Sequence, residues 1–280
     1  MKTPGRSQRL DVLLVQRGEI ASREKARRLI MAGEVYVNNQ VVDKPGKQVL
    51  NDAAITVRQS GIQYVSRGGL KLQKAIEYFG VDVSEKIAID VGASTGGFTD
   101  CLLQNGSRFV YSVDVGRGQL DWTLRNDDRV AVLERTNIRY VRPEQFDQEI
   151  GMATIDVSFI SLDKVIPVVA SLIKTRGQII ALIKPQFEAG RRNVGKGGVV
   201  KDPEIHRQVI QNICDLAMRT GLIVEGLTYS PVRGPAGNIE YLIWLHKGND
   251  AGCSAEESSI QYPASSIEKV VSESHAAFTD

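Results

Sequence analysis

The strongest constraint on the fold is an alternation, from Lys86 onwards, between short apolar runs and longer amphipathic runs. The apolar runs predict strands and the amphipathic runs predict helices, most clearly at residues 161–174 and 203–220. Strands separated by helices predict a parallel sheet covered on both faces, and two late strands suit a sheet whose last strand runs antiparallel. The predicted fold class is therefore α/β. The predicted strands are residues 87–91, 109–113, 130–133, 152–157, 178–183, 223–229 and 239–245.

Charge is distributed unevenly along the chain, although the net charge is only +2. Residues 1–60 carry eleven Lys and Arg against six Asp and Glu, whereas residues 249–280 carry one Lys against six acidic residues. The difference predicts separate parts of the chain. These are a basic domain at residues 1–60, a linker at residues 61–67, a larger domain at residues 68–248 and a flexible acidic tail at residues 249–280. The alternative for the end of this tail is a short terminal helix over residues 266–274.

Several classes of protein are not expected from this sequence. No apolar run approaches the roughly 20 residues that span a bilayer, and the charged N-terminus lacks the apolar stretch of a signal peptide. The three cysteines, Cys101, Cys214 and Cys253, are far apart, and no Cys-x-x-Cys motif or histidine pair occurs. This pattern predicts a protein of the reducing cytoplasm without a metal site.

The basic domain is predicted to contain two helices and a few short strands. Leu10, Leu13 and Leu14 have helical spacing, and Ser22 is a predicted N-cap for a second helix that ends at Gly33. The predicted strands are residues 35–37, 41–42 and 55–57, with a turn at Asn38-Asn39 between the first two.

The second helix carries four cations: Arg23, Lys25, Arg27 and Arg28. Such a cluster is either a solvated helix face or a surface that binds phosphates, since phosphate binding needs cations gathered on one face. The stretch RLDVLLVQRGEIASREKARRLIMAGEVYVNNQVV, residues 9–42, resembles the S4 RNA-binding domain. The resemblance implies that the four side chains face structured RNA, which is recognised by shape and phosphate more than by base sequence.

A glycine-rich turn, in the sequence DVGASTGGFTD, follows the first predicted strand of the larger domain. Glycines there permit a close approach of the backbone to a ligand, although a turn that needs glycine only for packing would look the same. A dinucleotide site would want G-x-G-x-x-G, and Ser94 breaks that match. An S-adenosylmethionine site wants one acidic residue before the turn and another at the end of the next strand, and Asp90 and Asp114 supply both.

Two residues of opposite charge end the fourth and fifth predicted strands. These are Asp156 and Lys184, which are predicted at the same edge of the sheet as the glycine-rich turn. Lys71 lies in a predicted helix before the first strand, and Glu240 begins the last strand. A lone lysine at a strand end is more often a surface residue than a catalytic one. An aspartate and a lysine together at the ligand-binding edge favour a catalytic site.

Residues 61–248 resemble the FtsJ-like ribose 2′-O-methyltransferases, whose motif is a Lys-Asp-Lys-Glu tetrad. With the S4-like domain, the chain to about residue 248 resembles the TlyA family of ribosomal RNA cytidine 2′-O-methyltransferases. The motifs stand in the expected order: VSRGGLKL, DVGASTGGFTD, VDVGRGQL, LERTNIR, DVSFISL, LIKPQFE, GKGGVVKDP and GNIEYLIWL. The resemblance implies a Rossmann-like methyltransferase sheet, S-adenosylmethionine as cofactor, and ribosomal RNA within ribosomal subunits as partner. It also implies a tetrad of Lys71, Asp156, Lys184 and Glu240, and a cofactor site of Asp90, Gly92, Ser94, Gly96, Asp114 and Asn137.

The chemistry explains why a lysine and carboxylates would be needed. A ribose hydroxyl is a weak nucleophile, so methyl transfer to it needs alignment and a proton acceptor. By position and by the resemblance, we assign Lys184 as this base. Lys71 either lowers the pKa of Lys184 or holds the nucleotide, while Asp156 and Glu240 orient the two amines.

A glycine-rich segment with several cations, Arg191 and Arg192 among them, lies between Lys184 and Pro203. It is either a solvated loop or, as we hypothesise, a mobile lid that grips RNA over the active site. Two other functions stay open at this point. One is an RNA-binding protein that assists ribosome assembly without catalysis. The other is a membrane-active haemolysin, for which we find no amphipathic or spanning element of convincing length.

Overall fold

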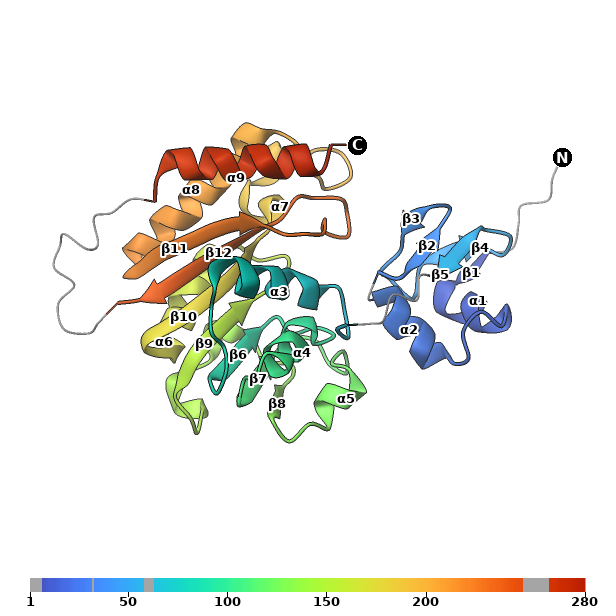
Figure 1. The fold of residues 1–280 in the computed structure, drawn as a ribbon, viewed down its shortest axis with the longest axis horizontal. Helices are drawn as coiled ribbons and strands as arrows, with labels where there is room; N and C mark the ends of the chain where they lie inside the picture. Colours follow the sequence, from blue (N-terminus) through green and yellow to red (C-terminus); the bar gives the residue numbers. More distant parts are fainter. Residues whose placement is uncertain (1–6, 32, 58–62, 249–261, 280) are drawn as a thin grey trace. The chain divides into compact units, whose positions relative to one another are not determined.

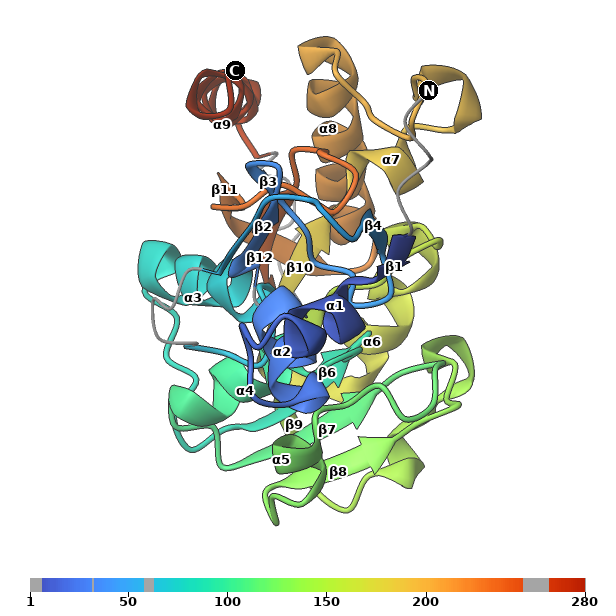
Figure 2. The ribbon, with the colours of Figure 1, turned by 90° about the vertical axis from the view of Figure 1, so that its right-hand side faces the viewer.

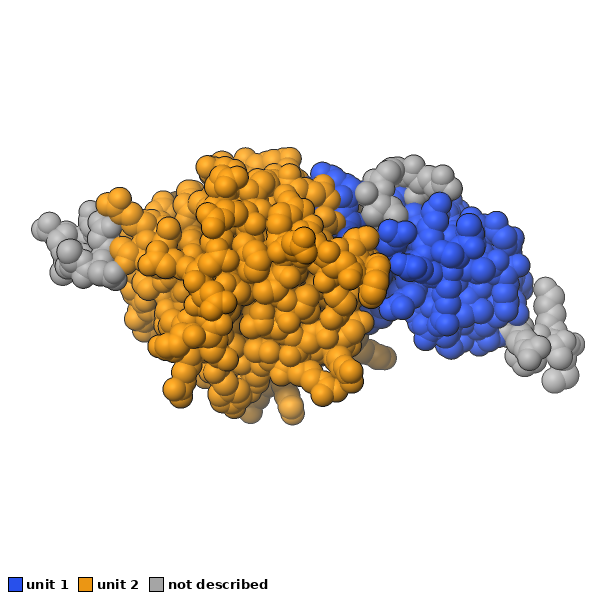
Figure 3. All heavy atoms as spheres, turned by 90° about the horizontal axis from the view of Figure 1, so that it is seen from below, with its two compact units in different colours: residues 1–69 blue, residues 70–280 orange. Residues whose placement is uncertain are grey.

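The computed structural model describes residues 7–31, 33–57, 63–248 and 262–279 (Figure 1). The chain divides into two compact units, residues 1–69 and residues 70–280, which Figure 3 distinguishes by colour. Each unit has a hydrophobic core of its own.

The first unit consists of two helices and two small antiparallel sheets: α1 (Leu10–Gln16), α2 (Arg23–Met31), the sheet β3-β2-β5 (Gln40–Val41, Val35–Val37 and Ile55–Val57) and the pair β1-β4 (Ser7–Arg9 and Gln48–Leu50). As predicted, Ser22 caps α2, because its Oγ accepts a hydrogen bond of 3.2 Å from the backbone N–H of Lys25. The predicted turn at Asn38 and Asn39 is also present. Both residues have positive φ angles, of 51° and 63°, as a type I′ hairpin turn requires.

The second unit is built on a seven-stranded sheet in the order β11-β12-β10-β9-β6-β7-β8 (Figure 1). The strands are β6 (Ile87–Val91), β7 (Phe109–Val113), β8 (Val130–Leu133), β9 (Ile150–Ile155), β10 (Ile173–Ile183), β11 (Leu222–Tyr229) and β12 (Tyr241–Lys247). Only β12 runs antiparallel to its neighbours, β10 and β11; the other paired strands are parallel. The predicted parallel sheet with an antiparallel last strand is therefore confirmed.

Helices lie over both faces of the sheet, as predicted: α6 (Ile166–Leu172), α8 (Pro203–Arg219) and α9 (Ala264–Ala277) on one face, α3 (Gly68–Phe79) and α4 (Gly97–Gln104) on the other. Alternate strand residues such as Ile89 and Ile243 join the core under the first three helices. On the opposite face, the ring of Phe79 stacks on Trp244 of β12, with 5.8 Å between ring centroids. α9 lies beside α8 (Figures 1 and 2).

The predicted helix at residues 161–174 is wrong in its extent. The segment forms a 3₁₀ turn at Leu162–Lys164 and then α6, and β10 already begins at Ile173. Pro167 stands in the first turn of α6, where a residue without a backbone N–H does not break helical hydrogen bonds. The proline therefore sets the start of the helix, and Ile173 pairs with Ile150 of β9 instead of extending it.

In the part of the acidic tail that the structure describes, the alternative of a terminal helix is confirmed and the flexible segment is wrong. That part forms α9, whose Ile267 and Val270 are buried in the core. Apolar residues three and four positions apart share one helix face, while acidic residues such as Glu268 are exposed. Residues 249–261 lie outside the described residues.

Three further expectations concern the linker, the cysteines and membrane insertion. The first two residues of the linker predicted at residues 61–67 lie outside the described residues. Cys101 and Cys214 are buried and free, and Cys253 lies outside the described residues. None of the helices in the described parts of the chain has the length and apolarity to cross a membrane.

Candidate active site

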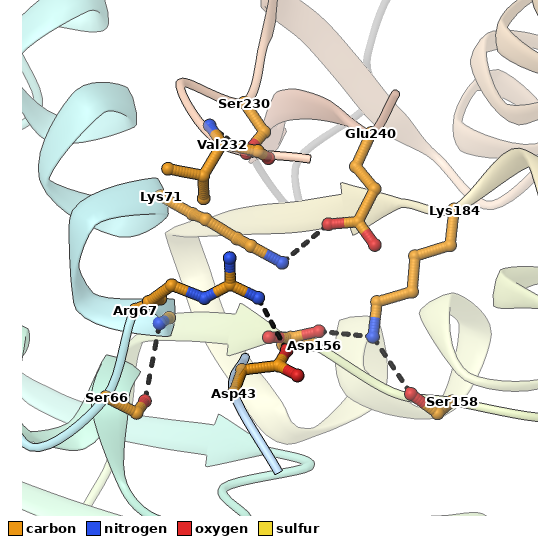
Figure 4. A network of polar contacts seen from close by, with 11 residues as sticks. Asp43, Ser66, Arg67, Lys71, Asp156, Ser158, Lys184, Ser230, Val232 and Glu240 are labelled. Carbon is orange, nitrogen blue, oxygen red and sulfur yellow. Dashed lines mark hydrogen bonds and ion pairs between the residues drawn. The ribbon is translucent and has the colours of Figure 1, made fainter. Parts of the chain in front are cut away.

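The sheet brings the residues of the expected tetrad to one edge. Asp156 and Lys184 are the first residues after β9 and β10, so both lie at the carboxyl edge of the parallel strands. Glu240 directly precedes β12, and the amino end of an antiparallel strand lies at that same edge. The fourth residue, Lys71, projects from the first turn of α3 towards Glu240 (Figure 4).

The four side chains form two ion pairs, one lysine with one carboxylate in each. The Nζ of Lys71 donates to Oε2 of Glu240 at 2.5 Å, and Nζ of Lys184 lies 2.6 Å from Oδ1 of Asp156 (Figure 4). Lys184 also donates to the hydroxyl of Ser158 at 3.0 Å. Both lysines are 8% exposed and Glu240 is 1% exposed. Buried charges are tolerated only when they are paired, so this pairing accounts for two cations in a largely dry site.

The two carboxylates of the tetrad differ in the groups that surround them. Burial raises the pKa of Asp156, but the amines of Lys184 and Lys71 outweigh it, so the pKa lies below its usual value and the group is ionised. The Oε1 atom of Glu240 is buried without a hydrogen-bond partner among the described residues. It faces Gly234, where any Cβ would collide with it. Glu240 therefore has one acceptor atom in use and one available.

A cavity of about 460 Å³ adjoins the tetrad at the ends of β6, β7 and β9. Gly92 permits its shape, because φ is +86° there and a Cβ would stand 2.6 Å from the backbone oxygen of Asp156. The carboxylate of Asp114 is held in place by the backbone N–H groups of Ser94, at 2.8 Å, and Gly116, at 2.6 Å. The lining residues include Gly92, Ser94, Asp114, Val115, Gln119, Asn137, Ile138, Asp156, Ser158 and Phe159.

Two residues expected at the cofactor do not line this cavity. Asp90 is completely buried and accepts hydrogen bonds from the hydroxyls of Thr99 (2.7 Å) and Thr154 (3.0 Å). Burial raises its pKa to about 7. Gly96 has a φ of +97° at the start of α4, where a Cβ would collide with Leu124. The structure therefore gives both residues a supporting position beneath the glycine-rich turn.

The cavity wall includes an exposed aromatic residue that the sequence analysis did not single out. Phe159 is 90% exposed, and its ring centroid lies 5.1 Å from that of Phe187. Its φ is +64°, which is costly for a bulky residue and is typical of functional sites. The position directly after the acidic strand end, in DVSFISL, was the available signal. Ser158, which accepts a hydrogen bond from Lys184, stands at the same place in the sequence and was not singled out either.

The cations expected to bind RNA occupy two separate surfaces. On α2, Arg23, Lys25 and Arg27 are exposed and Arg28 is half-buried, and Arg23 also forms an ion pair of 2.9 Å with the buried Asp11. In the second unit, Arg191 and Arg192 belong to a short 3₁₀ turn and are exposed. These two arginines have no carboxylate partner within 4.0 Å among the described residues.

The chain is similar to known proteins over nearly its whole length. Residues 8–55 match the S4 domain, and residues 64–247 match the FtsJ-like methyltransferases. A Bacillus subtilis (strain 168) protein provisionally named as an rRNA methyltransferase, YqxC, is 50% identical, with 96% of this chain and 95% of the relative covered. The 16S/23S rRNA (cytidine-2′-O)-methyltransferase TlyA of Mycobacterium tuberculosis (strain ATCC 25618 / H37Rv) is 42% identical, with 90% and 94% covered.

A solved structure agrees with these relatives. A Streptococcus thermophilus protein, provisionally named a hemolysin, superposes with a TM-score of 0.75 at 43% identity, with 97% of each chain covered. The match to FtsJ-like methyltransferases agrees with the observed fold, a seven-stranded sheet with a cavity at its carboxyl edge. The chain belongs to the FtsJ-like methyltransferase family, and an S4 domain precedes its methyltransferase domain.

Proposed function

We propose that this protein transfers the methyl group of S-adenosylmethionine to the ribose 2′-hydroxyl of a cytidine in ribosomal RNA. The observation that carries the proposal is the pair of lysine–carboxylate contacts beside the cavity at the carboxyl edge of the sheet. The names of the Bacillus and Mycobacterium relatives support ribosomal RNA as the substrate, and the name of the latter supports cytidine.

The cavity has the groups that S-adenosylmethionine needs. Bound there, this cofactor supplies an electrophilic methyl group on a sulfonium. Asp114 is placed to accept hydrogen bonds from two ribose hydroxyls, and Ser94 and Asn137 offer polar groups on either side of it. The open backbone at Gly92 leaves room next to Asp156 for the rest of the molecule. Asp90 holds the turn from below.

Lys184 is the proposed proton acceptor for the ribose hydroxyl, a role that requires its neutral amine, so the ammonium paired with Asp156 must first release a proton to solvent. Its Nζ lies beside Asp156 and Ser158, both of which line the cavity, so the amine lies where cofactor and nucleotide would meet. Asp156 fixes the direction of the amine, and Glu240 does the same for Lys71. Alignment of hydroxyl and methyl group supplies the remainder of the rate acceleration.

The RNA would be held by cations and an aromatic residue. In the S4 domain, which we place at residues 1–60 ahead of a linker at 61–67, the exposed cations of α2 suit phosphate contacts. In the methyltransferase domain, which we place at residues 68–248, Arg191 and Arg192 suit the same task. The exposed ring of Phe159 is placed to stack against an unpaired base. Ribosomal subunits in the cytoplasm are the proposed partner.

Substitution of Lys184 by alanine tests the proposal. Lys184→Ala is expected to lower methyl transfer from labelled S-adenosylmethionine to ribosomal RNA by about a hundredfold or more, while cofactor binding survives. Lys174→Ala removes an exposed lysine from the same strand and is the matched control. Mapping of the labelled nucleotide then identifies the base and the ribose position. Full turnover by Lys184→Ala, or label on a base atom, would contradict the proposed function.

A further inference from the structure

A polar core lies between α8, β12 and α9, and α9 lies beyond residue 247, where the FtsJ-like match ends. The last residues of the chain also reach the loop that precedes Glu240. Arg233 of that loop donates a hydrogen bond to the carbonyl of Phe278, and its guanidinium lies 5.3 Å over the Phe278 ring. The C-terminal segment therefore contacts a loop of the candidate active site although it belongs to no predicted motif.

His206 of α8 stands at the centre of this polar core and is completely buried. Its Nε2 lies 3.1 Å from the carbonyl oxygen of Val200, and because a carbonyl only accepts, Nε2 carries the proton. The other nitrogen, Nδ1, is then an acceptor, with the hydroxyl of Tyr241 at 2.8 Å and Nε2 of His275 at 3.1 Å. Burial lowers the pKa of His206 to about 4, so the ring is neutral near pH 7.

α9 supports this arrangement through a second side chain. The hydroxyl of Ser274 lies 3.0 Å from that of Tyr241 and 2.8 Å from the carbonyl oxygen of Val271, and it can donate its one proton to either. Ser274 and Tyr241 are both completely buried. Tyr241 therefore links α9 to His206.

Asn238 holds the same stretch of backbone from the other side. Its Oδ1 accepts a hydrogen bond of 2.9 Å from the N–H of Val200, and its Nδ2 donates to the carbonyl of Gly198 at 2.9 Å. Asn238 is 1% exposed. Both backbone groups of Val200 are thus bound by buried side chains from different elements. Gly198 has a positive φ of 80°, and the stretch is held locally by turn hydrogen bonds from the N–H of Gly195 to the carbonyl of Val199 and from the N–H of Gly198 to the carbonyl of Gly195.

The bound backbone belongs to the segment that we call the basic loop, residues 190–201. Val200 stands directly before Lys201, and this exposed lysine is one of four cations in the loop, with Arg191, Arg192 and Lys196. This support also reaches the tetrad. Asn238 lies two residues before Glu240 in the chain, and Tyr241, the hydrogen-bond partner of His206, lies one residue after Glu240. The basic loop and Glu240 therefore share one support.

We propose that His206 and Asn238 are positioning residues that fix the basic loop relative to Glu240, with α9 as the support behind them. The inference rests on the proposed function, because it takes the basic loop to contact RNA. Without the bond from His206 to Val200, the hydrogen bonds of Asn238 still hold this end of the loop, but its cations are held less tightly. RNA affinity then falls, while the cavity at the ends of β6, β7 and β9 is unchanged.

Substitutions at His206 can separate this role from a simple contribution to stability. Glutamine places its amide nitrogen near the position of Nε2 and can still donate to Val200, whereas asparagine reaches only the position of Nδ1, and phenylalanine fills the space without donating. His206→Phe and His206→Asn are expected to weaken the binding of ribosomal RNA about tenfold in the full-length protein, as expected for the loss of one buried hydrogen bond. His206→Gln is expected to stay within about twofold of the unsubstituted protein. The affinity for S-adenosylmethionine stays the same in all three.

Ile213→Ala is the matched control, because Ile213 is buried on the same helix and belongs to the core under the sheet. It lowers Tm but leaves RNA affinity unchanged. RNA affinity is measured by filter binding at a temperature well below every Tm. Equal RNA affinities for His206→Phe and Ile213→Ala, or no recovery by His206→Gln, would overturn the inference. Absence of methyl transfer by the unsubstituted protein would contradict the proposed function instead, and the RNA affinities would still decide the inference.

Discussion

The floor beneath the glycine-rich turn and the edge that carries the tetrad each hold an aspartate, and the two differ in burial and in charge: Asp90 is completely buried, whereas Asp156 is partly exposed. Asp90, on the floor, accepts hydrogen bonds from two threonine hydroxyls, and burial raises its pKa to about 7. Asp156, on the edge, lies between two lysine amines, which hold its pKa below the usual value despite partial burial. Asp90 lies within β6, one residue before its end, and Asp156 follows the neighbouring strand β9.

The comparison shows that burial and neighbouring groups together decide which task a carboxyl group can perform at this edge. Hydroxyl partners stabilise a carboxylate less than amines do, so Asp90 is protonated about half of the time near pH 7. A group in that state is suited to hold two strands and a helix together. Asp156 keeps its charge and is suited to orient a lysine. The following predictions separate these two roles.

The largest expected effect is on catalysis at the edge. Asp156→Asn removes the charge that orients Lys184, so the rate constant of methyl transfer is expected to fall about a thousandfold. Asp90→Asn keeps a polar group against Thr99 and Thr154, so in this variant the same rate constant is expected to fall by about tenfold or less. Single-turnover rates at saturating cofactor measure both. Equal losses in the two variants would mean that the two carboxylates do not have separate roles.

The next effect is a pH dependence of stability that arises on the floor. The pKa of Asp90 is raised from 3.8 to about 7, so between these values the unfolded chain is ionised while the folded protein retains the proton. The free energy of unfolding therefore falls as pH rises through this window, because the stabilising contribution of Asp90 is lost. Asp90→Asn does not titrate, so its stability relative to the unsubstituted protein is expected to rise by up to about 4 kcal/mol across it.

Urea unfolding of both proteins at pH 4.5, 6 and 8 measures this difference, because the other titrating groups cancel in the comparison. Asp156→Asn provides the contrast. The pKa of Asp156 is lowered, so its contribution is present above 3.8 and is lost only as pH falls below that value. A stability difference for Asp90→Asn that does not change with pH would show that Asp90 is ionised throughout.

The smallest expected effect concerns one hydrogen bond on the floor. Thr154→Val keeps the shape of the side chain and removes the donor at 3.0 Å from Asp90. The free energy of unfolding is expected to fall by about 1 kcal/mol at pH 5, where Asp90 is neutral, and by about 2 kcal/mol at pH 8, where it is charged. Thr228→Val, in another buried threonine of the sheet, is the control and is expected to show no such pH dependence.

Much of the sheet could be predicted because its strands are apolar on both faces. The bounds of β6, β7 and β8 agree with the prediction residue for residue. The segment around Pro167 was misjudged because its apolar residues fit a helix and a strand equally well, and only the proline marks the boundary. The tail was expected to be flexible because its composition is polar on average, while its apolar residues lie on a single helix face, as the alternative of a terminal helix requires.

The candidate site was predictable where it depends on strand ends. Asp156 and Lys184 could be placed at one edge from the parallel order alone. The pairing of Lys71 with Glu240 could not, since it depends on how α3 and an antiparallel strand meet. Asp90 was expected at the cofactor because its motif suggests it. The alternation of side chains along β6 instead points it into the core, against Thr99.

The position of β12 has a consequence for how the protein becomes active. β12 lies in the sheet between β10 and β11, both of which precede it in the chain, and it brings Glu240 to a lysine 169 positions away. A chain that folds as it is synthesised therefore has Lys71 and Lys184 in place before the carboxylate of Glu240 arrives. Insertion of this strand both closes the sheet and completes the tetrad. Under the roles proposed for these residues, methyl transfer then requires the assembled sheet, and a chain truncated before β12 is expected to lack it.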